Sequence, residues 1–136
     1  MSNNLEIKLR SRLESVDEAA RSADEFAKSC GFDEEFRYAL DLAVRESVAN
    51  AVKHGNKFDE SLPVEVRFDA DDDAFEISVR DHGAGFDIDG IPDPRDPENL
   101  LKANGRGILF MNSFMDEIRW LQAEGGGTEV KMVKRK

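Results

Sequence analysis

Cysteine is nearly absent from this sequence of 136 residues, which contains only Cys30. A single cysteine permits no intramolecular disulfide and no cysteine-based metal cluster, so we expect neither in this fold. Proline is also scarce, and three of the 4 prolines lie between residues 92 and 97. Proline disrupts both helices and central strands, so this segment is predicted to be a mobile loop.

Long hydrophobic runs are missing as well. No apolar stretch approaches the roughly 18 residues of a membrane-spanning helix, and the polar opening MSNNLEIKLR has no signal-peptide pattern. We therefore expect a cytoplasmic protein with no membrane partner. The formal net charge of -10 argues against direct binding of nucleic acid and favours basic protein surfaces as partners.

The residues that are present predict a single domain over residues 1–136, because 40% of them are hydrophobic, enough for one core. Alternating apolar residues predict strands near 5–10, 64–68, 75–79, 117–122 and 127–133. Helical periodicity predicts helices near 16–29 and 33–54, and a third after Gly107. This order favours the α+β class, as a two-layer α/β sandwich with helices on one face of a mostly antiparallel mixed sheet.

The first candidate site lies on the second predicted helix, in the segment RESVANAVKHGN. Glu46 and Asn50 are four residues apart, so their side chains share one face of the helix. They fall at the margin of its apolar sector, where a carboxylate requires a charged or polar neighbour. A metal-binding or catalytic pair fits this position, and so does a polar pair whose hydrogen bonds are satisfied within the protein.

The second candidate is the segment DHGAGFD, at the end of a predicted strand. Strand alternation places Asp81 on the inward face, and Gly83 and Gly85 remove side chains directly after it. A buried carboxylate accepts hydrogen bonds only, so it suits an exocyclic amine such as that of adenine, and glycines let a planar ligand approach the backbone. Taken alone, the motif favours the simpler interpretation, a glycine turn that Asp81 caps.

The third candidate is the segment GRGILFM, where Gly105 and Gly107 precede a helical pattern. Free backbone N–H groups at such a helix start form an anion site, to which Arg106 adds a guanidinium fork. A surface loop followed by a packed helix is the alternative. Thr128, on the last predicted strand, shares its inward parity with Val130, which by itself predicts only a buried threonine.

Together, the three motifs resemble the ATP-binding domain shared by DNA gyrase, sensor histidine kinases and mismatch-repair ATPases, the Bergerat fold. Residues 46–50 resemble its N box, residues 81–85 its first glycine box and residues 105–107 its second. Within this superfamily, ESVANAVKHGN, DHGAGFD and GRGILFMNSFMDEI are most similar to the bacterial anti-sigma-factor serine/threonine kinases. The similarity covers nearly the whole chain, and those kinases are this domain and little else.

The resemblance implies a role for each motif residue. Glu46 would be the general base that accepts the proton of a serine or threonine hydroxyl, and Asn50 would hold Mg²⁺. Asp81 would bind the adenine amine of ATP with the help of Thr128.

The remaining motif residues would serve the phosphates. Backbone approach is implied for four glycines: Gly83, Gly85, Gly105 and Gly107. Arg106 would reach a phosphate, and residues 87–104 would be the lid over the nucleotide.

The resemblance also implies partners. The phosphorylated substrate would be a STAS-domain anti-anti-sigma protein, the second partner a sigma factor, and the protein a homodimer. A non-catalytic alternative remains at this point: a regulatory module that binds ATP and switches partners without transferring phosphate. Glu46 favours the enzyme, because a binding module has no evident use for a base.

Overall fold

The structure is a computed structural model that describes residues 3–83, 115–123 and 125–136. Its described elements are β1 (Asn3–Leu9), α1 (Glu14–Ser29), α2 (Glu34–Asn50), the π-helical turn η1 (Ala51–Gly55), β2 (Val64–Ala70), β3 (Ala74–Arg80), β4 (Glu117–Gln122) and β5 (Thr128–Arg135). The predicted lid, the predicted helix after Gly107 and the second glycine box lie outside the described residues.

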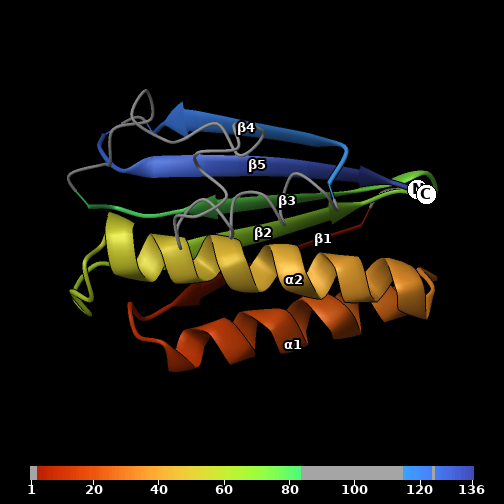
Figure 1. Cartoon of the computed structure of the whole chain (residues 1–136), viewed down its shortest axis with the longest axis horizontal. Coiled ribbons are helices and arrows are strands. Elements are labelled where there is room, and N and C mark those ends of the chain that lie inside the picture. The colour runs from red at the N-terminus through yellow and green to blue at the C-terminus, as the bar shows by residue number, and fades with distance from the viewer. Residues whose placement is uncertain (1–2, 84–114, 124) are drawn as a thin grey trace, which may run out of the picture.

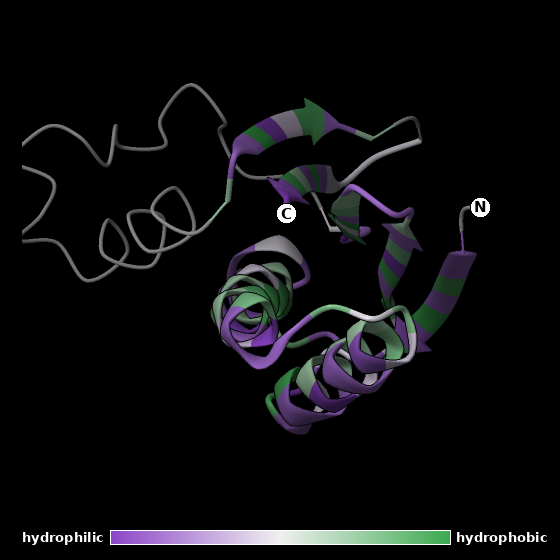
Figure 2. Cartoon of the chain, turned by 90° about the vertical axis from the view of Figure 1, so that its right-hand side faces the viewer, coloured by the Kyte–Doolittle hydropathy of each residue, from purple (hydrophilic) through white to green (hydrophobic). Residues whose placement is uncertain are grey.

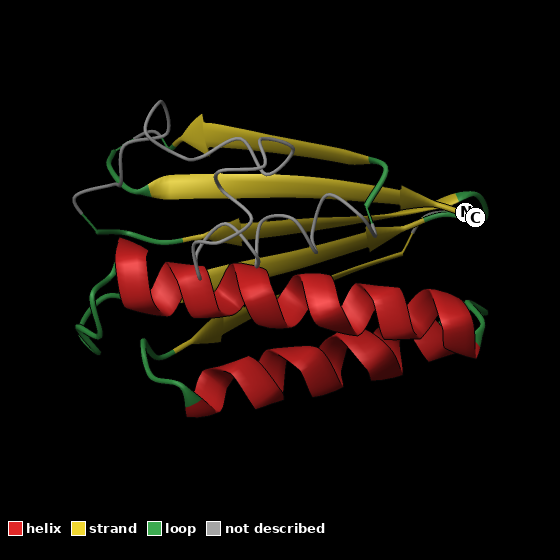
Figure 3. Cartoon of the chain, viewed as in Figure 1, coloured by secondary structure: helices red, strands yellow, loops and turns green. Residues whose placement is uncertain are grey.

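The five described strands form one sheet in the order β1-β2-β3-β5-β4. Helices α1 and α2 cover one of its faces, as Figures 1 and 3 show. This arrangement confirms the two-layer α+β prediction. All four described strand pairings are antiparallel, in a sheet that was expected to be mostly antiparallel. Both ends of the described chain lie near the β2–β3 turn, because Asn3 pairs with Ala70 and Ala74 pairs with Arg135.

Helix α1 contributes a row of alanines to the interface with α2 and the sheet. Ala19, Ala20, Ala23 and Ala27 are all buried. Small side chains let two helices and a sheet pack closely, so the bulk of the core comes from other elements. The described core joins buried residues of both helices with those of the sheet, and Figure 2 shows the two helices side by side against the strands.

A cluster of phenylalanine rings fills the end of the core away from the candidate site. Phe75 of β3 lies 5.6 Å from Phe32 and 5.8 Å from Phe26 between ring centroids, in edge-to-face arrangements. Such pairs add to the area that they bury. The strand alternation predicted for this region is confirmed, because Phe75 is fully buried and the next residue, Glu76, is not.

The start of α2 was predicted correctly to within one residue. Asp33 is its N-cap, and the Asp33 side chain accepts a hydrogen bond from the backbone N–H of Phe36 at 2.8 Å. Helix α1 begins at Glu14, two residues before the predicted start. No described helix has both the length and the apolar character needed to cross a membrane.

The end of the second helix differs from the prediction. The helix was expected to stay regular to His54, but α2 ends at Asn50 and the chain continues as the π turn η1. Its wider loop is closed by a hydrogen bond from the N–H of Asn56 to the carbonyl oxygen of Ala51 at 2.8 Å. Single π turns of this kind are frequent at functional sites.

Candidate functional site

The C-terminal ends of α2 and β3 meet at one edge of the molecule, at the left of Figure 1. Asp81 follows the last residue of β3, and the residue is only 2% exposed. The inward direction predicted from strand alternation is therefore confirmed. Asp81 is the one ionisable residue among the buried polar residues of the described chain, and carboxylates are seldom fully buried.

The strand ends hold Asp81 through three hydrogen bonds. The backbone N–H of Asp81 donates to the carbonyl oxygen of Thr128 at 3.0 Å. In return, Oδ1 of Asp81 accepts from the N–H of Thr128 at 3.1 Å and from the N–H of Gly83 at 3.2 Å. Oδ2 accepts no hydrogen bond from the described residues, which leaves one oxygen for a donor on a ligand.

Burial raises the pKa of the Asp81 carboxyl above its ordinary value. The two backbone donors, Thr128 and Gly83, oppose this shift because they stabilise the ionised form, as do the charges of His82 and Arg80. A carboxylate that pays this desolvation cost gains most from a ligand that donates a hydrogen bond to Oδ2. Perturbed groups of this kind occur preferentially at functional sites.

Three glycines crowd the Asp81 segment. A Cβ on Gly55 would lie 2.2 Å from Oδ2 of Asp81, and one on Gly83 would lie 1.8 Å from the carbonyl oxygen of Gly55. Gly127, at φ 90°, would place a Cβ 2.0 Å from the carbonyl oxygen of Asp81. These contacts are far below the normal range for a Cβ, so the three positions require glycine.

A small hollow opens beside Asp81. It is lined by Ser47, Asn50, Ala51, Val79, Asp81, Trp120, Thr128 and Val130. Three of the predicted site residues, Asn50, Asp81 and Thr128, therefore line one space although they come from α2, the end of β3 and β5. Their sequence spacing alone did not require this proximity.

Thr128 contributes an unsatisfied polar atom to the hollow. The residue is 3% exposed, and its Oγ1 has no hydrogen-bond partner among the described residues. A buried hydroxyl without a partner costs free energy, so such a group indicates a bound ligand or water. With the carboxylate of Asp81, which also lines the hollow, it offers a ligand one acceptor and one group that can donate or accept.

Glu46 lies one helical turn before Asn50 on α2, and both side chains are half-buried as expected. Asn50 lines the hollow, whereas Glu46 does not. Glu46 makes no hydrogen bond or ion pair with the part of the chain that the structure describes. Within the described residues, the two side chains are therefore not hydrogen-bonded to each other.

The other predicted site residues lie outside the described ranges. They are Gly85, Gly105, Arg106 and Gly107, together with the lid at residues 87–104. Their assignment to phosphate binding remains a prediction from the resemblance. Within the described ranges, no cluster of three His, Cys, Asp or Glu side chains could hold a metal. Magnesium held by one protein ligand, phosphates and water needs no such cluster.

Sequence reasoning missed three residues of the site: Gly55, Gly127 and Trp120. The signals were present for the glycines, since Gly55 ends the N-box helix and Gly127 directly precedes Thr128. Trp120 was assigned only to a strand, yet it lines the hollow with Asp81 and packs against the core.

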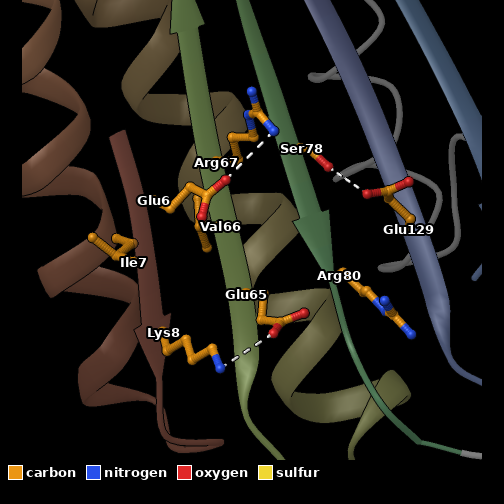
Figure 4. Close-up of a pocket in the computed structure, with 9 residues that line it drawn as sticks. All are labelled: Glu6, Ile7, Lys8, Glu65, Val66, Arg67, Ser78, Arg80 and Glu129. Atoms are coloured by element: carbon orange, nitrogen blue, oxygen red, sulfur yellow. Dashed lines mark hydrogen bonds and ion pairs between the residues drawn. The ribbon is translucent and has the colours of Figure 1, made fainter. Parts of the chain in front are cut away.

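A second concavity lies on the opposite face of the sheet, where Figure 4 shows charged side chains from neighbouring strands. These charges neutralise one another: Arg67 lies 3.4 Å from Glu6, and Lys8 lies 3.7 Å from Glu65. Ser78 donates a hydrogen bond to Glu129 at 2.7 Å. Paired, partly exposed charges are common on a sheet face that is in contact with solvent. The hollow at Asp81 is therefore the better candidate site.

Comparison with known proteins identifies the class to which this fold and site belong. Residues 9–134 match the histidine kinase-like ATPase domain, and the chain belongs to that family. A crystal structure of the RsbU and RsbW domains from Mycobacterium tuberculosis has the same fold, with a TM-score of 0.71. The similarity covers 98% of this chain and 32% of that chain at 20% sequence identity.

Sequence relatives identify the group within the family. The serine-protein kinase RsbW of Oceanobacillus iheyensis is 29% identical over 121 residues, which are 85% of this chain and 77% of that protein. The anti-sigma F factor of Clostridium perfringens is 32% identical over 100 residues, 71% of this chain and 70% of that protein. RsbW of Bacillus subtilis is 37% identical over 101 residues, 70% of this chain and 62% of that protein. The resemblance to anti-sigma-factor serine/threonine kinases is thereby confirmed.

Proposed function

We propose that this protein binds Mg·ATP, transfers its terminal phosphate to a serine or threonine of a STAS-domain anti-anti-sigma protein, and sequesters a sigma factor. The single observation that carries the proposal is the buried Asp81 carboxylate. Its Oδ2 accepts no hydrogen bond from the described residues, and Asp81 lines the hollow together with Asn50 and Thr128. The exocyclic amine of adenine is a donor that a carboxylate oxygen, which can only accept, is suited to bind. The serine-protein kinases and the anti-sigma F factor among the relatives bear names that agree with this function.

Asn50 is the residue that would hold Mg²⁺. Its amide oxygen is a hard ligand of the kind that Mg²⁺ accepts, and the side chain lines the hollow that Asp81 and Thr128 share. The bound ion would neutralise charge that develops on the phosphate oxygens during transfer. The placement of Asn50 next to the base-binding residues supports this assignment, because a nucleotide must reach both.

Glu46 is the residue that would accept the proton of the attacking hydroxyl. It lies one turn from Asn50 and makes no hydrogen bond or ion pair within the described residues, so no described contact is lost when it acts as a base. Positioning and proton removal are the main contributions that a protein makes to phosphoryl transfer.

The test is transfer of labelled phosphate from ATP to a STAS-domain protein of the same organism, run beside nucleotide titrations. Glu46→Gln keeps the shape of the side chain but cannot take up the proton, so ATP and the partner should still bind while transfer falls by roughly 10² to 10⁴. Asn50→Ala should instead weaken Mg·ATP itself, because a metal ligand is lost.

Two outcomes contradict this assignment. Wild-type protein that binds ATP and partner but transfers nothing would replace the kinase with a partner switch that uses ATP only as a ligand. Equal transfer by Glu46→Gln would show that another group is the base.

The homodimer and the sigma factor are parts of the proposal with their own measurement. Sedimentation at tens of micromolar, with and without ATP, should give twice the chain mass, and a sigma factor should co-purify with the protein. A monomer under both conditions contradicts the dimer without affecting the assignment of the nucleotide site.

A further inference from the structure

Asn56 connects three parts of the chain that meet beside the candidate site. It directly follows η1, and its side chain is 2% exposed. Its Nδ2 lies 2.8 Å from Oγ of Ser11, 3.1 Å from the carbonyl oxygen of Leu62 and 3.0 Å from that of Pro63. Its Oδ1 accepts a hydrogen bond from the backbone N–H of His82 at 2.8 Å.

These partners admit one orientation of the amide. If the group were turned by 180°, its oxygen would face two carbonyl oxygens and its NH₂ would face the N–H of His82. Every polar atom of the Asn56 side chain thus has a partner within the protein, and a fully satisfied buried network fixes a unique geometry. Asn56 is buried and both ends of its amide are engaged, so we expect its influence on the site to pass through the residues that it holds.

The bond to His82 lies where the sheet no longer supports the chain. β3 ends at Arg80, and the next three backbone N–H groups find separate acceptors: Thr128 for residue 81, Asn56 for residue 82 and the Asp81 carboxylate for residue 83. Asn56 supplies the middle one and is the only acceptor of the three that comes from the helix side of the site. The close contact between Gly55 and Gly83 lies directly beside it.

We propose that Asn56 is a positioning residue. Its buried amide joins the end of η1 to residues 81–83 and so holds the Asp81 carboxylate at the place where it meets the nucleotide. This inference rests on the proposed function for its consequence, and on the hydrogen bonds alone for its geometry. The same link keeps Asn50, six residues earlier in the chain, at a fixed position relative to Asp81.

The geometry can be tested without any ligand, by amide hydrogen exchange in the full chain. The N–H of Thr128 donates to the Asp81 carboxylate and does not touch Asn56, so its exchange rate reports the position of that carboxylate. Ile77, fully buried in the middle of β3, reports global opening. In Asn56→Ala, exchange at Thr128 should rise at least tenfold more than exchange at Ile77.

Two further variants separate positioning from simple loss of stability. Ser11→Ala removes one acceptor of the same amide but leaves the bond to His82, so exchange at Thr128 and Ile77 should rise by equal factors. Asn56→Asp keeps an oxygen for the N–H of His82 while it loses the donors. It should therefore be less stable overall, but with the Thr128 amide protected relative to Ile77 as in the wild type.

Nucleotide binding then tests the consequence. At a temperature where all variants are folded, Asn56→Ala should bind ADP about tenfold more weakly than the wild type, and Ser11→Ala should stay within twofold of it. Equal rises at Thr128 and Ile77 in Asn56→Ala would overturn the positioning role, and so would unchanged ADP affinity. If the wild type binds no adenine nucleotide, the proposed function fails, whereas the exchange ratios still decide whether Asn56 holds Asp81.

Discussion

Gly55 and Asp81 are in direct contact although they are 26 residues apart: a methyl group on Gly55 would lie 2.2 Å from Oδ2 of the Asp81 carboxylate. Gly55 is the last residue of η1, and Asp81 is the first residue after β3. The contact brings the end of the N-box helix against the carboxylate proposed to bind adenine. Any side chain at position 55 must displace either the helix end or Asp81.

Gly55→Ala is therefore expected to damage both stability and nucleotide binding. Overpacking of this kind typically costs about 1–3 kcal/mol, and the displaced carboxylate should weaken ADP binding as well. Urea unfolding and calorimetry measure the two effects. Gly125→Asn is the control for ADP affinity. Gly125 lies in a turn at φ 85°, a conformation that asparagine adopts more readily than most residues, and a Cβ there would have no atom within 4 Å. Unchanged ADP affinity in Gly55→Ala would contradict the contact as a determinant of the site.

Asp81→Asn tests the adenine assignment. The substitution keeps an oxygen for the backbone donors of Thr128 and Gly83 but replaces the other oxygen with a donor, which would face the adenine amine. Affinity for ATP should fall by about 1–3 kcal/mol, while inosine triphosphate, whose base has a carbonyl oxygen in place of the amine, should lose less. Calorimetry with both nucleotides gives the comparison. Equal losses of affinity for ATP and inosine triphosphate would show that Asp81 does not bind the adenine amine.

The same carboxylate gives a pH prediction in the absence of nucleotide. Burial raises the folded-state pKa of Asp81 above the unfolded value of about 3.9. The folded state therefore binds this proton more tightly than the unfolded state does. Its stabilising effect is complete below the unfolded pKa and is lost as the pH rises through the folded pKa.

Asp81→Asn, which cannot ionise, should consequently be more stable than the wild type at pH 7, and the difference should shrink as the pH falls toward 4. Urea unfolding at several pH values measures it, with Glu18→Gln as a control at an exposed position of α1. A wild type that is at least as stable as Asp81→Asn at pH 7 would show that the hydrogen bonds from Thr128 and Gly83 outweigh the cost of burial.

The features that local sequence patterns control could be predicted here. The alternation of β3 correctly placed Asp81 on the inward face, and the periodicity of α2 correctly placed Glu46 and Asn50 at the margin of the core. Both predictions need only the geometry of one element. The resemblance of the three motifs to a known family then predicted that these residues form one site, and the family comparison confirmed the family.

Features that depend on contacts between distant segments could not be predicted. The π turn η1 is closed by the backbone N–H of Asn56, whose side-chain partners are Ser11, Leu62, Pro63 and His82. No local pattern specifies such a set. The hairpin of β4 and β5 was predicted, but not that β5 enters the sheet between β3 and β4, where it brings Thr128 to Asp81.

Trp120 offers a direct optical test of the site, because it is the single tryptophan of the chain. It lines the hollow with Asp81 and Thr128, and its strand partner on β5 is Val130. A base bound in the hollow must contact or displace the indole. ADP should therefore change the tryptophan fluorescence, with a titration midpoint equal to the dissociation constant from calorimetry.

Substitution of Trp120 measures how much this residue contributes to the free energy of ADP binding. Trp120→Leu should weaken ADP binding by about 1 kcal/mol or more, because contacts between a base and an aromatic ring contribute roughly 1–3 kcal/mol. Leu121→Ala is the matched control: Leu121 is the next residue of β4, is 39% exposed and does not line the hollow. It should bind ADP as the wild type does and keep the fluorescence change. Fluorescence that stays constant while calorimetry shows saturation would place the nucleotide away from Trp120, and hence outside the hollow that Asp81 and Thr128 form.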